Sequence, residues 1–258
     1  MADALIEIKN LLDEKYFQFN NTAFIETDPI SIPHQFSKKE DVEVSAFLMA
    51  TIAWGNRTSI INNGNKLMAL MNQTPHDFIL NFSKKDEARF QNFVHRTFNS
   101  NDCIFFLQAL KNLYKNHGGL ESAFSNNFNK KDENVKTAIS NFRTLFLSLQ
   151  HLSRVEKHLS NPLSNSSAKR LCMFLRWMVR NDKHGVDFGL WKTIASSQLC
   201  LPLDVHTGNV SRKLGLLNRK QNDWKSVEEI TNVLKQFDIK DPIKYDFALF
   251  GLGAFESF

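Results

Sequence analysis

The sequence has little cysteine. Its three cysteines, Cys103, Cys172 and Cys200, are far apart, odd in number and never form a Cys-x-x-Cys pair. This argues against a disulfide framework and against a four-cysteine zinc or iron–sulfur site, and it is typical of proteins from a reducing compartment. We therefore expect the protein to use no metal ion and no other cofactor.

Long apolar runs are missing as well. No stretch reaches the roughly 20 apolar residues of a membrane span. Residues 1–20 carry acids and lysines where a secretory signal would need an apolar run. There is no internal repeat and no low-complexity linker, and the length suits one large domain or two interleaved subdomains. We expect a cytoplasmic protein without a membrane segment.

The overall composition is that of an ordinary globular protein, with 42% hydrophobic and 23% charged residues. The 23 phenylalanines predict thick packing between helices, with a few rings left for stacking on a ligand. A net charge of +5 favours a polyanionic partner, because lysine and arginine that neutralise phosphates release counterions. A membrane surface is the competing explanation for this charge.

Apolar residues recur at helical spacing along nearly the whole chain, whereas only residues 198–203 hint at a strand. This pattern predicts an all-α fold. Ser37, followed three residues later by Glu40, is the expected N-cap of a central apolar helix. The expected helices cover residues 2–19, 38–54, a segment ending near 71, a short segment from 75, 103–117, 135–152, 168–179, 187–196, 207–214, 226–237 and 242–252.

Two residues between positions 160 and 215 are candidates for chemistry. Lys169 opens an apolar helix directly after the breaker Asn161–Ser167, and Asp204 directly precedes another helix. A helix N-terminus and an apolar wall both favour the neutral amine, which is the nucleophilic form of lysine. Taken alone, however, Lys169 also fits a solvated lysine beside Arg170, and Asp204 also fits an ordinary N-cap.

Four separate segments resemble the helix-hairpin-helix DNA glycosylases, in particular the 8-oxoguanine glycosylase branch. The sequence is most similar to a bacterial family of conserved hypothetical proteins. The string PLDVHTGNVSRKL is similar to the superfamily's Asp-x-His segment, and KRLCMFLR is similar to the helix that carries the catalytic lysine. VSAFLMATIAWGNR and KYDFALFGLGAF resemble the opening buried helix and the closing helix. These strings occupy residues 202–214, 169–176, 44–57 and 244–255.

The resemblance implies a single glycosylase-like domain of two interleaved helical subdomains, about residues 38–150 and the N-terminal helix plus 151–258. Lys169 and Asp204 are expected to face each other across a cleft between the subdomains. The implied activity is excision of a damaged base, such as an oxidised purine, by a monomer acting on duplex DNA. Lys169 would attack C1′ and form a Schiff base, and Asp204 would deprotonate the lysine or stabilise the sugar cation.

Further site residues follow from the same resemblance. Asp246 and Phe250 are one helical turn apart and share a face, so they are expected to bind the flipped base together. His206 is expected to organise the turn, and Arg176 and Arg180 are expected either to extend a phosphate-binding face or to be solvated. The remaining expected contacts are Trp54 and Asn56 to the base, and Ser166, Ser167, Arg170 and Arg212 to DNA phosphates.

The sequence also departs from the superfamily pattern. The hairpin is usually a Gly-apolar-Gly turn whose backbone amides bind a phosphate, but Asn161–Ser167 contains no glycine. Lys169 and Asp204 are separated by 35 residues, because residues 182–197 form an insertion. Two other functions therefore stay open, a DNA- or RNA-binding module without turnover and a helical adaptor that binds protein.

Overall fold

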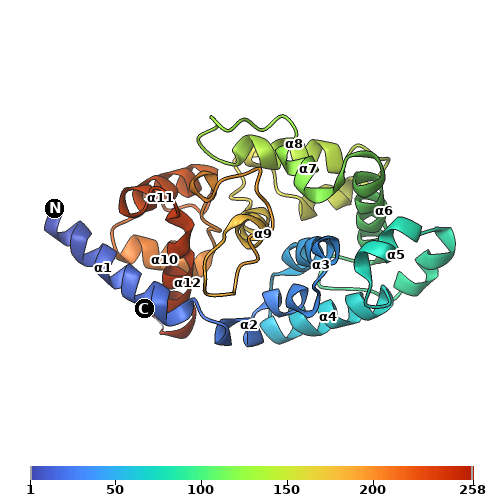
Figure 1. The fold of residues 1–258 in the computed structure, drawn as a ribbon, viewed down its shortest axis with the longest axis horizontal. Coiled ribbons are helices and arrows are strands. Elements are labelled where there is room, and N and C mark those ends of the chain that lie inside the picture. The colour runs from blue at the N-terminus through green and yellow to red at the C-terminus, as the bar shows by residue number, and fades with distance from the viewer. Residues whose placement is uncertain (1, 257) are drawn as a thin grey trace. The chain divides into compact units, whose positions relative to one another are not determined.

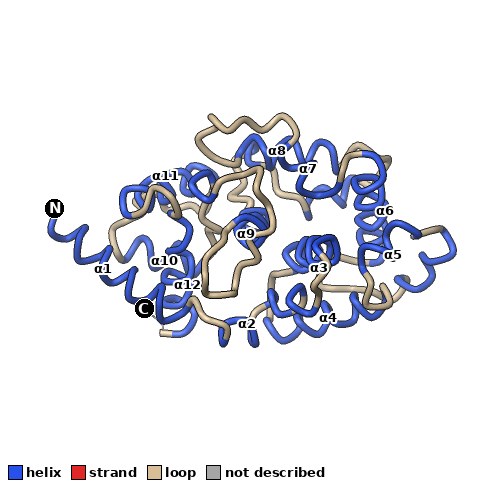
Figure 2. Tube along the Cα trace, viewed as in Figure 1, coloured by secondary structure: helices blue, strands red, loops and turns tan. Residues whose placement is uncertain are grey.

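The structure is a computed structural model that describes residues 2–256 and 258. Within these residues the secondary structure consists of α-helices and short 3-10 helices joined by loops, with no strand (Figure 2). The expected all-α fold is confirmed. None of the described helices is long and apolar enough to cross a membrane.

The chain divides into two compact units. Unit 1 contains residues 1–24, 130–136 and 161–258, and unit 2 contains residues 25–129 and 137–160. The chain therefore passes between the units several times. The boundaries at residues 25 and 161 differ from the expected positions near 38 and 151, because the segment after the first helix and the segment before the hairpin both belong to unit 2.

Helix α12 packs against both α1 and α10 in unit 1, and the three helices lie close together in Figure 1. Two glycines of α12 allow this close packing. A Cβ atom on Gly251 would lie 2.1 Å from the Phe19 ring of α1, and one on Gly253 would lie 3.0 Å from His206 of α10. The helices of unit 1 are α1 (Ala2–Phe19), α9 (Lys169–Val179), α10 (Val205–Lys213), α11 (Trp224–Phe237) and α12 (Tyr245–Phe255).

Unit 2 is built around α3, whose residues from Val42 to Ile52 are all buried. Phenylalanines of α3, α6 and α8 meet around Phe47, whose ring contacts Phe106, Phe142 and Phe146. The helices of this unit are α3 (Lys39–Ile52), α4 (Arg57–Leu70), α5 (Pro75–Asn81), α6 (Ser100–Asn116), α7 (Gly119–Ser125) and most of α8 (Lys136–Phe146), and α2 (Ala23–Thr27) spans the boundary.

A buried network of ion pairs runs through unit 1. Arg176 and Arg180 of α9 both bind Asp187, at 3.2 Å and 3.0 Å, and Arg180 also binds Asp241 at 2.9 Å. Both arginine side chains are at most 5% exposed. Neither expectation for Arg176 and Arg180 was correct, because they are neither solvated nor free to face a phosphate.

Two expected helix features are wrong. Ser37 is not an N-cap, since α3 begins at Lys39 and Lys38 occupies the cap position without a side-chain hydrogen bond. No helix forms over residues 187–196. The amides of Phe188 and Trp191 instead donate to the carbonyls of Trp177 and Met178 at the end of α9, so they are not available to build a helix of their own.

Residues 198–203, the one segment whose pattern hinted at a strand, form no strand. Ser196–Gln198 is a 3-10 turn, and the following backbone is held by a side chain rather than by a neighbouring strand. The amide of Leu201 donates to the hydroxyl of Thr231 at 3.1 Å. Residues 199–203 are buried, which explains their apolar composition.

Candidate active site

Lys169 and Asp204 lie next to each other. The Lys169 Nζ atom is 3.8 Å from Asp204 Oδ2, and both side chains are partly buried, with 27% and 22% exposed. Lys169 is the first residue of α9, and Asp204 is the N-cap of α10. Both residues belong to unit 1, so their closeness does not depend on the arrangement of the two units. A lysine and a carboxylate at this distance need only a small movement, or one bridging water, to exchange a proton.

The two carboxylate oxygens of Asp204 have different surroundings. Oδ1 accepts hydrogen bonds from the Thr207 amide at 3.0 Å and from the Thr207 hydroxyl at 3.3 Å. The same hydroxyl accepts from the Asp204 amide at 2.9 Å, which completes a capping box. Oδ2 faces Lys169. The cap therefore fixes the carboxylate while one oxygen remains directed at the amine.

The hairpin before Lys169 uses left-handed backbone although it has no glycine. Asn165 has a φ angle of 62° and Ala168 has a φ angle of 47°. Asparagine is among the residues that adopt this region most readily, whereas alanine is strained there. Ala168 is also the N-cap of α9 and is buried. The turn thus reaches a backbone conformation that glycine would usually supply, and its last residue directs Lys169.

A loop between α10 and α11 binds both the hairpin before Lys169 and the backbone of Asp204. The Asn222 side chain donates to the Asp204 carbonyl at 2.9 Å. Its neighbour Asp223 accepts from the Asn165 side chain of the hairpin at 3.0 Å. The ion pair with Arg219 lowers the pKa of Asp223, which keeps this carboxylate charged. Residues 219–223 therefore brace the segments that carry Lys169 and Asp204.

Arg212 stabilises the brace. Its guanidinium donates to the carbonyls of Arg219 and Gln221, at 2.7 Å and 3.2 Å, and to the Asn222 side chain at 2.6 Å. Several of its N–H groups are thus used inside the protein. A role for Arg212 in binding a phosphate stays a prediction and would have to use its remaining donors.

Asp246 is a buried carboxyl close to the pair. Burial raises its pKa to about 6, although the Arg176 guanidinium, which binds it directly, acts in the opposite direction. The negative charge of Asp204 raises the pKa further, and the positive charge of Lys169 lowers it. Lys169, Asp204 and Asp246 therefore form one electrostatically coupled group. Because Asp246 is only 4% exposed, a ligand would need to reach it through this group.

Phe250 and His206 lie on the exposed side of this group. Their rings meet edge to face with centroids 6.0 Å apart. His206 Nδ1 donates to the Gly253 carbonyl at 3.2 Å, which ties the start of α10 to α12. Phe250 is one turn beyond Asp246 on α12 and is only partly buried. Binding of a base by Asp246 and Phe250 stays a prediction.

The expected phosphate contacts of the hairpin have local roles. The Ser166 hydroxyl accepts from the Ala168 amide at 3.4 Å, and its backbone pairs with Asp223. The Ser167 carbonyl lies 3.9 Å from the Cys172 sulfur, which donates to it weakly. Arg170 follows Lys169 in the first turn of α9 and is partly buried. Binding of DNA phosphates by Ser166, Ser167 and Arg170 stays a prediction.

Trp54 and Asn56 belong to unit 2, unlike the other expected site residues. Asn56 is the N-cap of α4, and its side chain accepts from the Ser59 amide at 3.1 Å. The ring of Trp54 is covered by the guanidinium of Arg96, whose carbon atom lies 4.7 Å from the ring centroid. The expected stacking of a base on Trp54 would therefore require either the opposite face of the ring or displacement of Arg96.

Metal ligands and thiols are further groups that can carry chemistry. Among the described residues, no group of histidine, cysteine and acidic side chains is arranged to hold a metal ion. All three cysteines are free and buried, and burial raises the pKa of Cys200 to about 12. Cys103 and Cys172 are shifted in the same direction for the same reason. These thiols are protonated at neutral pH and are poor nucleophiles.

Sequence reasoning missed the residues that hold the site together. Asp223 carries a readable signal, since Asp223 followed by Ser226 is an N-cap pattern, and Asp223 does cap α11. The pairing of Asp187 and Asp246 with Arg176 has no such signal, because the partners are 11 and 70 residues apart.

Comparison with known proteins identifies a family for the chain. Residues 28–255 match the model of a family described as a protein of unknown function, DUF2400. No curated protein and no solved structure matches the chain at a significant level. The match covers most of both units, including Lys169, Asp204 and Asp246. The chain therefore belongs to the DUF2400 family.

Proposed function

We propose that this protein is a DNA glycosylase with lyase activity, which removes a damaged base from duplex DNA through Lys169. The observation that carries this proposal is the 3.8 Å distance between Lys169 Nζ and Asp204 Oδ2. The proposal also rests on the resemblance of the surrounding segments to the helix-hairpin-helix glycosylases. The net charge of +5 is compatible with a nucleic-acid partner.

The proposed reaction uses the two side chains in sequence. Lys169 loses a proton to Asp204, and its nitrogen forms a bond to C1′ of the sugar while the glycosidic bond breaks. The electron pair of the broken bond leaves with the base, which takes up a proton. The sugar ring then opens to give an imine on Lys169, and β-elimination breaks the bond to the 3′ phosphate. Asp204 passes the proton that it received on to the departing base, and its carboxylate then stabilises the positive charge of the protonated imine.

The brace and the cap explain how such a reaction would be supported. A carboxylate stabilises a developing cation best when it is already oriented and does not need to reorganise. The capping box with Thr207 and the bond from Asn222 hold Asp204 in place from two sides. The strained residue Ala168 sets the direction of the first turn of α9. These contacts supply orientation without using Oδ2.

Borohydride trapping tests the proposal, because it reduces an imine to a stable covalent adduct. The wild-type protein is expected to form an adduct with at least one duplex from a panel of damaged bases. Lys169→Gln is expected to abolish trapping, since glutamine keeps much of the length but has no amine. Asp204→Asn is expected to slow base release about 10²–10³-fold and to leave binding largely intact, because most affinity for DNA resides in phosphate contacts.

Lys192→Gln is the matched control. Lys192 lies in the inserted segment and donates to the Gly189 carbonyl at 2.6 Å, so its substitution is expected to leave trapping unchanged. Trapping that survives in Lys169→Gln and is lost in Lys192→Gln would identify Lys192 as the nucleophile. A wild-type protein that binds damaged duplexes, releases no base and forms no adduct would instead be a binding module without turnover.

A further inference from the structure

A tight turn in unit 2 presents a single arginine to solvent. His95 and Phe98 pair through two backbone hydrogen bonds of 2.8 Å and 2.9 Å, and Arg96 and Thr97 form the tip between them. Arg96 has a φ angle of 54°, a left-handed conformation that is rare for a long side chain. Such conformations persist only where the surroundings impose them, and they are enriched at ligand-binding positions.

The turn is held from three directions. The buried ring of His95 bonds through Nε2 to the Trp54 carbonyl and through Nδ1 to the Asn63 side chain of α4, each at 3.1 Å. Nε2 donates to the carbonyl, because a carbonyl oxygen can only accept. Phe98 is fully buried, and Arg154 donates to the Thr97 carbonyl at 2.9 Å. The tip is therefore rigid.

The guanidinium of Arg96 lies over the turn that connects α3 and α4. Its carbon atom is 4.7 Å from the centroid of the Trp54 ring. A Cβ atom on Gly55 would lie 2.9 Å from Arg96 Nη1, so the guanidinium lies directly against the backbone of this turn. Arg96 is exposed, and no carboxylate of residues 2–256 lies within ion-pair distance of it. Its N–H donors are positioned but have no acceptor within this part of the chain.

The helix that follows the Trp54–Gly55 turn carries two further cationic residues. The first turn of α4 contains no acidic residue and begins with Arg57. Lys66, further along α4, reaches toward the same loop and lies 3.4 Å from the Asn92 carbonyl. A cation next to the N-terminal end of a helix is electrostatically unfavourable, whereas an anion there is favoured. The fold therefore holds a strained, uncompensated guanidinium where a negative ligand would relieve the repulsion.

We propose that Arg96 binds a phosphate group beside the Trp54–Gly55 turn, and that this phosphate belongs to the backbone of a nucleic-acid strand. Guanidinium groups bind phosphate through two parallel N–H···O bonds, and the basic balance of the chain favours a polyanion. A small phosphorylated molecule shares this chemistry and is distinguished by experiment. The site lies in unit 2 and Lys169 in unit 1, so the inference does not depend on the proposed catalytic step.

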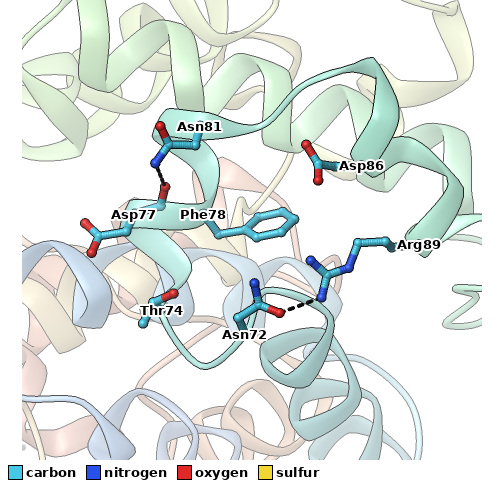
Figure 3. Close-up of a pocket in the computed structure, with 7 residues that line it drawn as sticks. All are labelled: Asn72, Thr74, Asp77, Phe78, Asn81, Asp86 and Arg89. Carbon is cyan, nitrogen blue, oxygen red and sulfur yellow. Dashed lines mark hydrogen bonds between the residues drawn. The ribbon is translucent and has the colours of Figure 1, made fainter.

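A second exposed arginine serves as the control. Arg89 also lies over an aromatic ring, 5.1 Å from the centroid of Phe78, and donates to the Asn72 side chain at 2.6 Å. It lines a pocket of about 260 Å³ that also contains Asp77 and Asp86 (Figure 3). The nearby carboxylates balance its charge, and its backbone is not left-handed. Arg89 thus matches Arg96 in exposure and ring contact but lacks the features that carry the inference.

Replacement of Arg96 by glycine separates binding from stability. Glycine adopts the left-handed backbone without strain, so Arg96→Gly is expected to keep the Tm or raise it by about 2–4 °C. If the arginine were only structural, its loss would lower the Tm. Binding of a fluorescently labelled, undamaged duplex by the full chain, measured by anisotropy, is expected to weaken about 5–10-fold. The slope of log K against log salt is expected to fall by about one phosphate contact.

Arg96→Gln is expected to weaken duplex binding like Arg96→Gly, and Arg89→Gln is expected to bind like the wild type. The duplex is undamaged and the measurement needs no turnover, so a failure of the catalytic proposal leaves it unaffected. If the wild type and both Arg96 variants bind the duplex with equal affinity, Arg96 does not bind the phosphate of a nucleic-acid strand.

Inorganic phosphate distinguishes the two sources of the ligand. Trp54 is the only partly exposed tryptophan, since Trp177, Trp191 and Trp224 are each at most 1% exposed, so emission changes can be assigned with Trp54→Phe. Phosphate is expected to change the Trp54 emission of the wild type but not of Arg96→Gly. A phosphate response with unchanged duplex binding would assign the site to a small phosphorylated molecule. The absence of both responses would overturn the proposal.

Discussion

The interiors of the two units are built differently. Unit 2 is filled by aromatic rings, such as Phe124 and Phe142, which stack with centroids 3.8 Å apart. Unit 1 contains a network of buried arginines that share aspartates, with Arg180 and Asp187 both fully excluded from solvent, whereas unit 2 holds the buried Asp102, which pairs with Arg154. Aromatic packing tolerates small shifts of its members, because dispersion forces depend little on direction. Buried ion pairs require defined geometry, because a charge left without its partner is costly.

The difference follows the location of the candidate site. The ion-pair network reaches from Arg180 through Asp187 and Arg176 to Asp246, and Asp246 is coupled to Lys169 and Asp204. In unit 1, which carries the candidate catalytic pair, buried ion pairs therefore fix the positions of the side chains next to that pair.

The largest expected effect comes from removing one charge of the network. Asp187→Ala leaves Arg176 and Arg180 without a shared partner, and it should lower the free energy of unfolding by about 3–5 kcal/mol. In unit 2, Phe142→Leu should cost roughly 1–2 kcal/mol, because much of the apolar contact remains. Chemical denaturation followed by circular dichroism measures both. Similar losses in the two variants would contradict the contrast between the units.

A pH-dependent effect is expected from Asp246. Its native pKa of about 6 lies above the usual value for aspartate, so the native state keeps a proton that the unfolded chain has lost. The stabilisation is fully present below about pH 4 and is lost as pH rises through 6. Between pH 4 and 7, the Tm of Asp246→Asn should therefore rise relative to that of the wild type. Parallel curves of Tm against pH would show that Asp246 is already ionised.

The smallest expected effect concerns the hairpin. Ala168→Gly removes the strain of a left-handed alanine, and it should raise the free energy of unfolding by about 1 kcal/mol. Gly215→Ala is a useful counterpart, since Gly215 has a φ angle of 70° and open space around it, so the alanine there should be destabilising through strain alone. Destabilisation by Ala168→Gly would mean that the methyl group contributes more by packing than it costs.

The fold was largely predictable because its signals are local. The first helix has the predicted bounds, residues 2–19, and α9, α10 and α11 begin within one or two residues of the predicted positions. Lys169 and Asp204 were expected to face each other, and they lie 3.8 Å apart, although both belong to unit 1. In that case the signal was the resemblance, because neither residue stands out from its local sequence.

What could not be predicted depends on contacts between distant residues. The amphipathic pattern of residues 187–196 predicts a helix, but the amides of Phe188 and Trp191 bind the end of α9 instead. The burial of Arg176 and Arg180 depends on Asp187, Asp241 and Asp246, which the sequence does not mark as partners. Arg96 lies in a turn whose strain becomes visible only in the backbone angles.

The two carboxylate oxygens of Asp204 have different contacts, Oδ1 with Thr207 and Oδ2 with Lys169. This difference has a consequence for selection experiments. Helix capping needs only Oδ1, so asparagine, serine or threonine at this position would still satisfy the Thr207 amide. A library screened for solubility or folding would accept these residues freely. A library screened for charge-dependent chemistry would accept only aspartate, because glutamate is too long to cap. Position 204 should therefore accept several residues in the folding screen and only aspartate in the chemistry screen. This difference would show that the second carboxylate oxygen, Oδ2, is needed for function.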